Sequence, residues 1–193
     1  MEITAPQTGY DTAIKNAALK LAALDPEKTA ARAGARWDGQ DFIIPWFNEC
    51  LPLSSGKTTE RILWLHYLTS EGTKPPSGVY AAYREFPGAR FYEPAFDKRA
   101  LNPLVKRFGG DPEQLLTTGV ANGGYAVNIG DVAVTLTPLP HVPVTCCIWR
   151  GDEETGPGGG ILFDRTASGW LPAEDLAVLA SAVVYRLIKY KNT

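Results

Sequence analysis

The feature that most constrains the fold is a run of about forty strand-like residues, from Tyr125 to Asp164. Its segments alternate or run apolar, and turn residues separate them: YAVNI, DVAVTLTPL, VPVTCCIWR and GILFD, divided at Gly130-Asp131, at Pro140-His141 and at residues 151–160. Short connections of this kind join antiparallel neighbours, because parallel strands need a crossover of roughly a dozen residues or more. The sequence therefore predicts an antiparallel meander over residues 125–164.

A long helix is predicted to follow the meander. Pro172 suits the helix start, Glu174 and Asp175 suit its first turn, and Lys189 and Lys191 suit its carboxyl end, where cations complement the helix dipole. Apolar residues at helical spacing form a stripe that has to be buried: Leu176, Leu179, Val183 and Leu187. We expect this closing helix to cover one face of the meander.

The first third of the chain carries two helical patterns and a hairpin signal. An amphipathic helix is predicted over residues 10–24, and a shorter one between Asp25 as N-cap and Gly34. Asp38-Gly39 then predicts a hairpin turn, and Pro45 predicts that the second strand lies at a sheet edge.

The middle of the chain is predicted to be mainly helical. The segment RILWLHYL, residues 61–68, is apolar nearly all round, which is typical of a buried helix. A strand is predicted over residues 78–86, followed by two short helical pieces that Asn102-Pro103 separates and Gly109 ends. N-terminal helices and a hairpin, followed by a meander that one helix covers, make a single α+β domain over residues 1–193.

Composition places the chain among ordinary globular proteins: 45% of its residues are hydrophobic, 21% are charged, and the formal net charge is -2. No cluster of Lys and Arg provides the basic surface that nucleic-acid binding needs. No apolar run approaches the roughly 20 residues that cross a bilayer, and the N-terminus lacks the pattern of a signal peptide. We expect a cytoplasmic protein that binds neither nucleic acid nor membrane.

The three cysteines, Cys50, Cys146 and Cys147, predict no disulfide framework, because their number is odd and their spacing matches no known pattern. Cys146 and Cys147 are neighbours in a predicted strand, so their side chains point to opposite faces. We interpret them as small buried hydrophobes rather than as a shared metal site.

The chain has two histidines, and each leaves two interpretations open. His66 lies in the predicted buried helix, either as a core histidine bonded to a carbonyl or as a ligand. His141 lies in a proline-braced turn between two strands, either simply exposed or as a ligand of a metal or haem. The candidate cofactor-binding residues are these two histidines together with Tyr83, Arg84 and Trp149.

The acidic loop GDEETGPGGG, residues 151–160, leads into the strand ILFD and leaves another choice open. Asp152, Glu153 and Glu154 are either a solvated charged turn or the rim of a lid that meets a cation. Adjacent carboxylates repel one another, and a loop with few side chains lets a ligand approach the backbone closely. Together with Asp164, these three residues are the candidate metal ligands.

These motifs also carry a resemblance. GDEE, ILFD, LPAEDLAVL and the earlier LHYL are similar to a family of anaerobic bacterial and archaeal proteins known as a domain of unknown function. The similarity covers most of the chain and is most specific over residues 138–188, although Thr155-Gly156-Pro157 departs from the aromatic residue and alanine of the family. Some relatives carry an added iron–sulfur domain of the type found in corrinoid proteins of one-carbon metabolism. The resemblance implies a metabolic setting and assigns no catalytic residue.

Three functions of different classes fit these observations. The first is an accessory protein that binds a flat apolar cofactor, a haem or corrinoid, because five tryptophans and eight tyrosines accompany the two histidines. The second is a small enzyme that uses Asp152–Glu154 and Asp164, with Arg84, as acids, bases or metal ligands. The third is an interaction module that docks through the predicted edge strand around Pro45. A visible absorption band favours the first function, bound divalent metal the second, and a colourless metal-free dimer the third.

Overall fold

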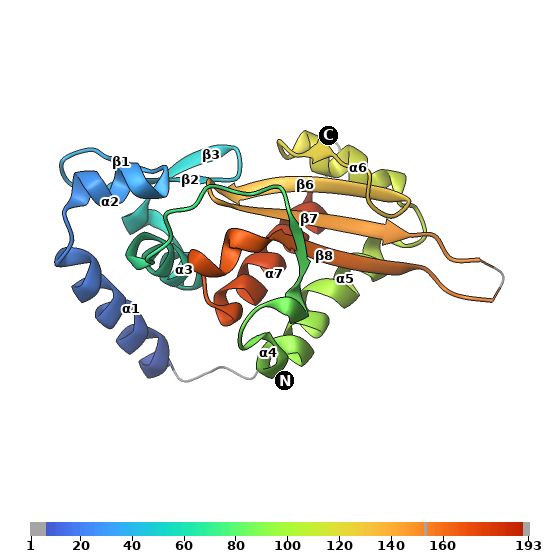
Figure 1. Cartoon of the computed structure of the whole chain (residues 1–193), viewed down its shortest axis with the longest axis horizontal. Coiled ribbons are helices and arrows are strands. Elements are labelled where there is room, and N and C mark those ends of the chain that lie inside the picture. Colours follow the sequence, from blue (N-terminus) through green and yellow to red (C-terminus); the bar gives the residue numbers. More distant parts are fainter. Residues whose placement is uncertain (1–6, 153, 191–193) are drawn as a thin grey trace.

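The larger sheet of the protein is an antiparallel meander with one added edge strand (Figure 1). The computed structural model describes residues 7–152 and 154–190, which form one α+β domain. Five strands pair in the order β4-β8-β7-β6-β5, and every pairing is antiparallel. The predicted meander is therefore confirmed. The strands are β4 (Tyr80–Ala82), β5 (Tyr125–Ala126), β6 (Val132–Leu139), β7 (Val142–Trp149) and β8 (Gly158–Asp164).

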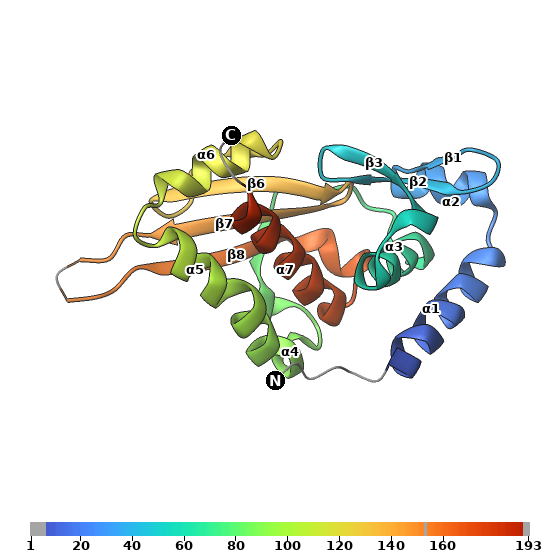
Figure 2. The same ribbon diagram turned by 180° about the vertical axis from the view of Figure 1, so that it is seen from behind.

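The closing helix α7 (Ala173–Lys189) packs on this sheet, as the sequence predicts. Its apolar stripe is buried at all four expected positions: Leu176, Leu179, Val183 and Leu187. Figure 2 shows α7 with α3 (Thr58–Thr69) on one side and α4 (Ala89–Phe96) and α5 (Asn102–Phe108) on the other. In the part of the chain that the structure describes, no helix is both long and apolar enough to cross a membrane.

The N-terminal part of the chain contributes helices and a small sheet. Helix α1 (Gln7–Ala22) contacts α3, and α2 (Pro26–Ala33) begins and ends as predicted. The Asp25 side chain accepts a hydrogen bond of 3.0 Å from the backbone N–H of Lys28, and Gly34 ends α2 with φ of 65°. The predicted buried helix is α3, whose buried residues include Trp64 and Tyr67.

The small sheet corrects the prediction for Pro45. Its strands β1 (Arg36–Trp37), β2 (Phe42–Trp46) and β3 (Glu49–Pro52) pair in that order, so the proline lies in the central strand rather than at an edge. Strand β1 pairs only with Phe42 and Ile43, and Pro45 lies beyond the end of β1. The missing N–H of the proline therefore removes no hydrogen bond to β1.

Two further predictions in the middle of the chain need correction. Only residues 80–82 of the expected strand over 78–86 pair with β8, and residues 83–85 form a 3-10 turn. Helices α4 and α5 follow one continuous helical path, joined by the π turn Asp97–Leu101, instead of breaking at Pro103. The ring of a proline clashes with the carbonyl four residues earlier, which here belongs to Arg99, and the wider π turn accommodates this clash.

The α6 helix (Glu113–Ala121) packs beside β5 and β6. A Cβ atom at Gly119 would lie 2.4 Å from Val134 Cγ2, so only glycine lets this helix approach the strand so closely.

Replacing Leu179 with Asp tests the packing of α7. The side chain is fully buried, and an unpaired charge in a core costs several kcal/mol, out of a total stability of about 5–15 kcal/mol. We expect Leu179→Asp to lose soluble expression or cooperative unfolding, measured by yield and by thermal melting in circular dichroism. The control Tyr185→Asp, at an exposed position of the same helix, should keep both. A soluble Leu179→Asp protein that melts cooperatively would refute this packing.

Candidate functional site

A groove of about 840 Å³ runs along one face of α7. Because an α-helix rises 1.5 Å per residue, the groove extends roughly 21 Å from Asp175 to Lys189. Its residues on α7 recur at the three- and four-residue spacing of a single helical face: Glu174, Asp175, Ala177, Val178, Ser181, Ala182, Tyr185 and Lys189. The groove face thus lies beside the stripe that α7 buries in the core.

Two walls rise from the helices that flank α7. One wall comes from α3, with contributions from α1 and β2: Thr59, Glu60, Ile62, Leu63, His66, Ala13 and Trp46. The other wall comes from α4 and the π turn: Tyr92, Ala95 and Arg99. The groove therefore joins segments that lie far apart in the sequence, and its walls combine apolar surface with a few charged groups.

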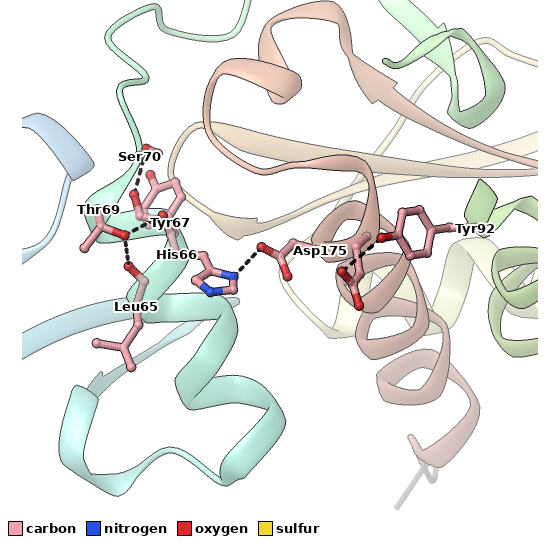
Figure 3. A network of polar contacts seen from close by, with 8 residues as sticks. Leu65, His66, Tyr67, Thr69, Ser70, Tyr92 and Asp175 are labelled. Atoms are coloured by element: carbon pink, nitrogen blue, oxygen red, sulfur yellow. Dashed lines mark hydrogen bonds and ion pairs between the residues drawn. The ribbon is translucent and has the colours of Figure 1, made fainter. Parts of the chain in front are cut away.

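His66 and Asp175 meet at the start of α7 (Figure 3). Nδ1 of His66 lies 2.7 Å from Oδ2 of Asp175. The Asp175 side chain is only 9% exposed, whereas that of His66 is 35% exposed. The first turn of a helix also stabilises a carboxylate through the helix dipole. With Nδ1–H donated to Asp175, the second ring nitrogen, Nε2, has no hydrogen-bond partner among the described residues and can contact a ligand.

The environment of His66 favours its protonated form. The hydrogen bond to Asp175 raises the pKa of His66, burial opposes that effect, and the charges of Asp175 and Glu174 raise the pKa further. A neutral His66 is needed for Nε2 to accept a proton or to coordinate a metal. Any such contact should therefore strengthen as the pH rises through the pKa of His66.

A second polar pair lies beside the first. The Tyr92 hydroxyl donates a hydrogen bond of 3.2 Å to Oε2 of Glu174. The negative charge of Glu174 raises the pKa of Tyr92, so the phenol keeps its proton. Two neighbouring carboxylates on the first turn of α7 thus each hold one ring, His66 from α3 and Tyr92 from α4 (Figure 3).

Comparison with protein-family models identifies the family of this chain. The model for a domain of unknown function, DUF3786, matches residues 25–186. The chain belongs to the DUF3786 family. The matched range contains both polar pairs and leaves α1 and Lys189 outside it. Searches of curated proteins and of solved structures each gave no match.

Among the described candidate residues from the sequence, His66 alone lines the groove of this DUF3786 protein. His141 is placed elsewhere, in the turn between β6 and β7. Its Nε2 lies 3.1 Å from the carbonyl oxygen of Arg32, and its ring stacks on Trp170 with 4.3 Å between ring centroids. Burial lowers the pKa of His141, which keeps the ring neutral. His141 therefore packs the β6–β7 turn against α2, and the two histidines do not share a site.

The other candidate cofactor-binding residues also lie outside the groove. Tyr83 is buried, donates its hydroxyl to the carbonyl oxygen of Ala173 at 2.9 Å, and stacks on Phe96. Burial raises the pKa of Tyr83 to about 12. Tyr83 thus fixes the start of α7 against α4. Arg84 is exposed, and Trp149 is partly exposed at the end of β7.

The acidic loop is a hairpin turn in the part that the structure describes. Asp152 accepts hydrogen bonds from the backbone N–H groups of Glu154 and Thr155, at 2.9 and 2.7 Å, as in an Asx turn. Glu153 lies outside the described residues. Asp164 lies at the opposite end of β8, so the structure does not bring it together with Asp152 and Glu154. Within residues 7–152 and 154–190, no three His, Cys, Asp or Glu side chains are grouped as metal ligands.

The expected loop over residues 151–160 is shorter than predicted. Gly158, Gly159 and Gly160 belong to β8, where they pair with residues 147–149 of β7. A Cβ atom at Gly159 would lie 2.6 Å from Cγ2 of Val105. Gly159 allows α5 to pack closely on the sheet, and all three glycines are paired in the sheet rather than in a loose lid.

Asp164 has a structural role at the end of β8. Its carboxylate accepts hydrogen bonds from the N–H and hydroxyl of Thr166, from the hydroxyl of Ser77 and from the N–H of Gly78. Burial alone would raise the pKa of Asp164, but the hydrogen bonds from Thr166 and Ser77 lower it to about 2.

Asp164→Asn should therefore destabilise the fold at neutral pH. The folded-state pKa lies below the unfolded value, so the carboxylate contributes stability above about pH 4, and this contribution is lost as the pH falls toward 2. We expect a loss of about 2 kcal/mol in urea unfolding at pH 7, with the difference from the wild type shrinking between pH 4 and 2. Asp152→Asn, in the exposed turn, is the control and should change stability far less. A pH-independent difference for Asp164→Asn would contradict this role.

The cysteines give a second prediction. Cys146 and Cys147 are fully buried, as expected, whereas Cys50 is exposed and all three thiols are free. Burial raises the pKa of Cys147 to about 11 and that of Cys146 further. We expect a native thiol assay with an aromatic disulfide reagent to show one fast thiol, which Cys50→Ser removes, and two that react only after unfolding. Fast reaction of all three would place the Cys146–Cys147 pair at an accessible surface.

Proposed function

We propose that this DUF3786 protein binds a small molecule in the α7 groove and that His66 is its central contact residue. The observation that carries the proposal is the His66–Asp175 hydrogen bond, which holds the ring of this groove-lining residue by Nδ1 and leaves Nε2 without a hydrogen-bond partner in the described part of the chain. The groove volume of about 840 Å³ falls within the roughly 300–1,000 Å³ typical of small-molecule sites.

The ligand class that we assign is a planar, metal-bearing cofactor, a haem or a corrinoid. An imidazole that donates Nδ1–H to a carboxylate is oriented and made more basic for metal coordination through Nε2. The groove also offers the exposed aromatic ring of Tyr185 and small side chains, Ala177 and Ala182, that leave room for a flat ring. Such a cofactor supplies redox or ligand-exchange chemistry when bound. In the chain itself, His66 would hold the metal and Asp175 would hold His66.

Acid–base catalysis at the same residues is the second candidate. The Tyr92–Glu174 pair favours it, because it places a protonated phenol in the same groove as the imidazole. His66 would accept a proton at Nε2, and Asp175 would keep the ring in the tautomer that allows this. This candidate replaces an enzyme based on Asp152–Glu154 and Asp164. The interaction module stays a third possibility, although β2, which carries Pro45, is the central strand of its sheet rather than an edge strand.

Visible absorption spectroscopy tests the cofactor proposal. Anaerobically purified wild-type protein is titrated with haemin and, separately, with hydroxocobalamin. We expect a shifted absorption band in the wild type and its loss in His66→Ala. Asp175→Asn should weaken binding by about 10- to 100-fold, because it removes the carboxylate that orients the ligating ring.

His141→Asn is the matched control, since it removes the histidine that lies outside the groove, and it should bind like the wild type. Thermal melting of each variant establishes that the fold is retained. The cofactor proposal is refuted if neither titration changes the spectrum, or if folded His66→Ala gives the wild-type shift.

A further inference from the structure

We infer that the α7 groove selects an anionic ligand through Arg99 and Lys189. This inference rests on the groove of the proposed function, but it does not require the ligand to carry a metal. The ligand would have an apolar body and a carboxylate, sulfonate or phosphate group, with the anionic group located away from His66.

The acidic groups of the groove already have partners. Asp175 accepts from His66, and Glu174 accepts from Tyr92. The Glu60 carboxylate accepts a hydrogen bond of 3.1 Å from the backbone N–H of Lys57 at the start of α3. Each carboxylate on the groove wall is thus engaged in holding a ring or a helix end.

The basic groups of the groove are different. Arg99 and Lys189 both line it, and neither forms an ion pair within the described part of the chain. Elsewhere in the same range, Arg150, Arg165 and Arg186 each pair with a glutamate. The carboxylates of the groove keep their negative charge, but Arg99 and Lys189 have no ion-pair partner among the described residues, so an anionic ligand can pair with them.

The π turn determines where Arg99 lies. Arg99 follows Tyr92 by seven residues, which is roughly 10 Å along a helix, and α4 and α5 run beside α7 in the same sense (Figure 2). The guanidinium therefore belongs to a part of the groove beyond the two polar pairs, toward Lys189. The next residue, Ala100, is fully buried and anchors the turn. Turns of this kind occur frequently at functional sites.

Lys189 has an alternative explanation that involves no ligand. As the last residue of α7, its ammonium group complements the helix dipole. That effect also places the positive charge at the end of the groove, beyond the apolar side chains of Val178, Ala182 and Tyr185. An apolar body on these three residues would place an attached anion beyond the two polar pairs, in the part of the groove where both cations lie.

A pair of fluorescent probes tests the inference directly. The anionic probe is 1-anilinonaphthalene-8-sulfonate, and the neutral one is N-phenyl-1-naphthylamine, which has the same aromatic body without the sulfonate. We expect the wild type to bind the anionic probe more tightly. Changing both Arg99→Gln and Lys189→Gln should weaken its affinity about fivefold, the size of two partly exposed ion pairs, and should leave the neutral probe unaffected.

Lys98→Gln is the matched control, because Lys98 shares the π turn and is exposed but does not line the groove. Unchanged melting temperatures exclude probe binding to a loosened fold. The inference is overturned if the wild type does not prefer the anionic probe, or if the double variant binds it with wild-type affinity.

The probe experiment and the cofactor titration can refute their two hypotheses separately. A missing haem or corrinoid spectrum, with intact selectivity for the anionic probe, removes the cofactor class and leaves the anionic site. Loss of that selectivity, with an intact cofactor spectrum, removes the role of Arg99 and Lys189 and leaves His66.

Discussion

The burial of α7 against the five-stranded sheet is the constraint on which the candidate site depends. The apolar stripe of this helix fixes its rotation about its own axis, and that rotation determines which residues face the groove. The same packing places the first turn of α7 between α3 and α4, where Asp175 reaches His66 and Glu174 reaches Tyr92. The Tyr83 hydroxyl bonds the carbonyl of Ala173 and secures the position of this turn. The site is thus a direct consequence of how the core is packed.

A polar residue in an otherwise apolar helix needs a partner, and the chain provides one for His66. Unpaired, a half-buried imidazole would lose part of its hydration without compensation. Asp175 restores a hydrogen bond and also selects one orientation of the ring, which serves metal coordination and proton transfer equally well. The second interpretation of His66 from the sequence, that of a ligand, therefore gains a physical basis. The first, a bond to a backbone carbonyl, describes His141 instead.

The repeating spacing of apolar residues along the chain predicted the strands and helices. Contacts between segments far apart in the sequence were not predicted. Alternation and turn residues gave the meander, and 3.6-residue spacing gave α7 and the buried α3. No such pattern connects His66 with Asp175, which are 109 positions apart. The acidic loop shows the reverse error, because Asp152 and Asp164 are close in sequence but lie at opposite ends of the β8 hairpin arm. The glycine run before ILFD likewise predicts an open loop, whereas in β8 the contact with Val105 excludes a side chain at Gly159.

The ring tautomers of the two histidines show whether Asp175 orients the ring of His66. Long-range ¹H–¹⁵N correlation spectra distinguish a protonated from an unprotonated ring nitrogen in neutral histidines, and His141→Asn assigns the two spin systems. Above the pKa of His66, we expect opposite tautomers: Nδ1–H in His66, donated to Asp175, and Nε2–H in His141, donated to the carbonyl oxygen of Arg32. Asp175→Asn should alter the His66 signals alone. A His66 ring that carries its proton on Nε2, or that averages between both tautomers in the folded wild type, would show that Asp175 does not orient this ring.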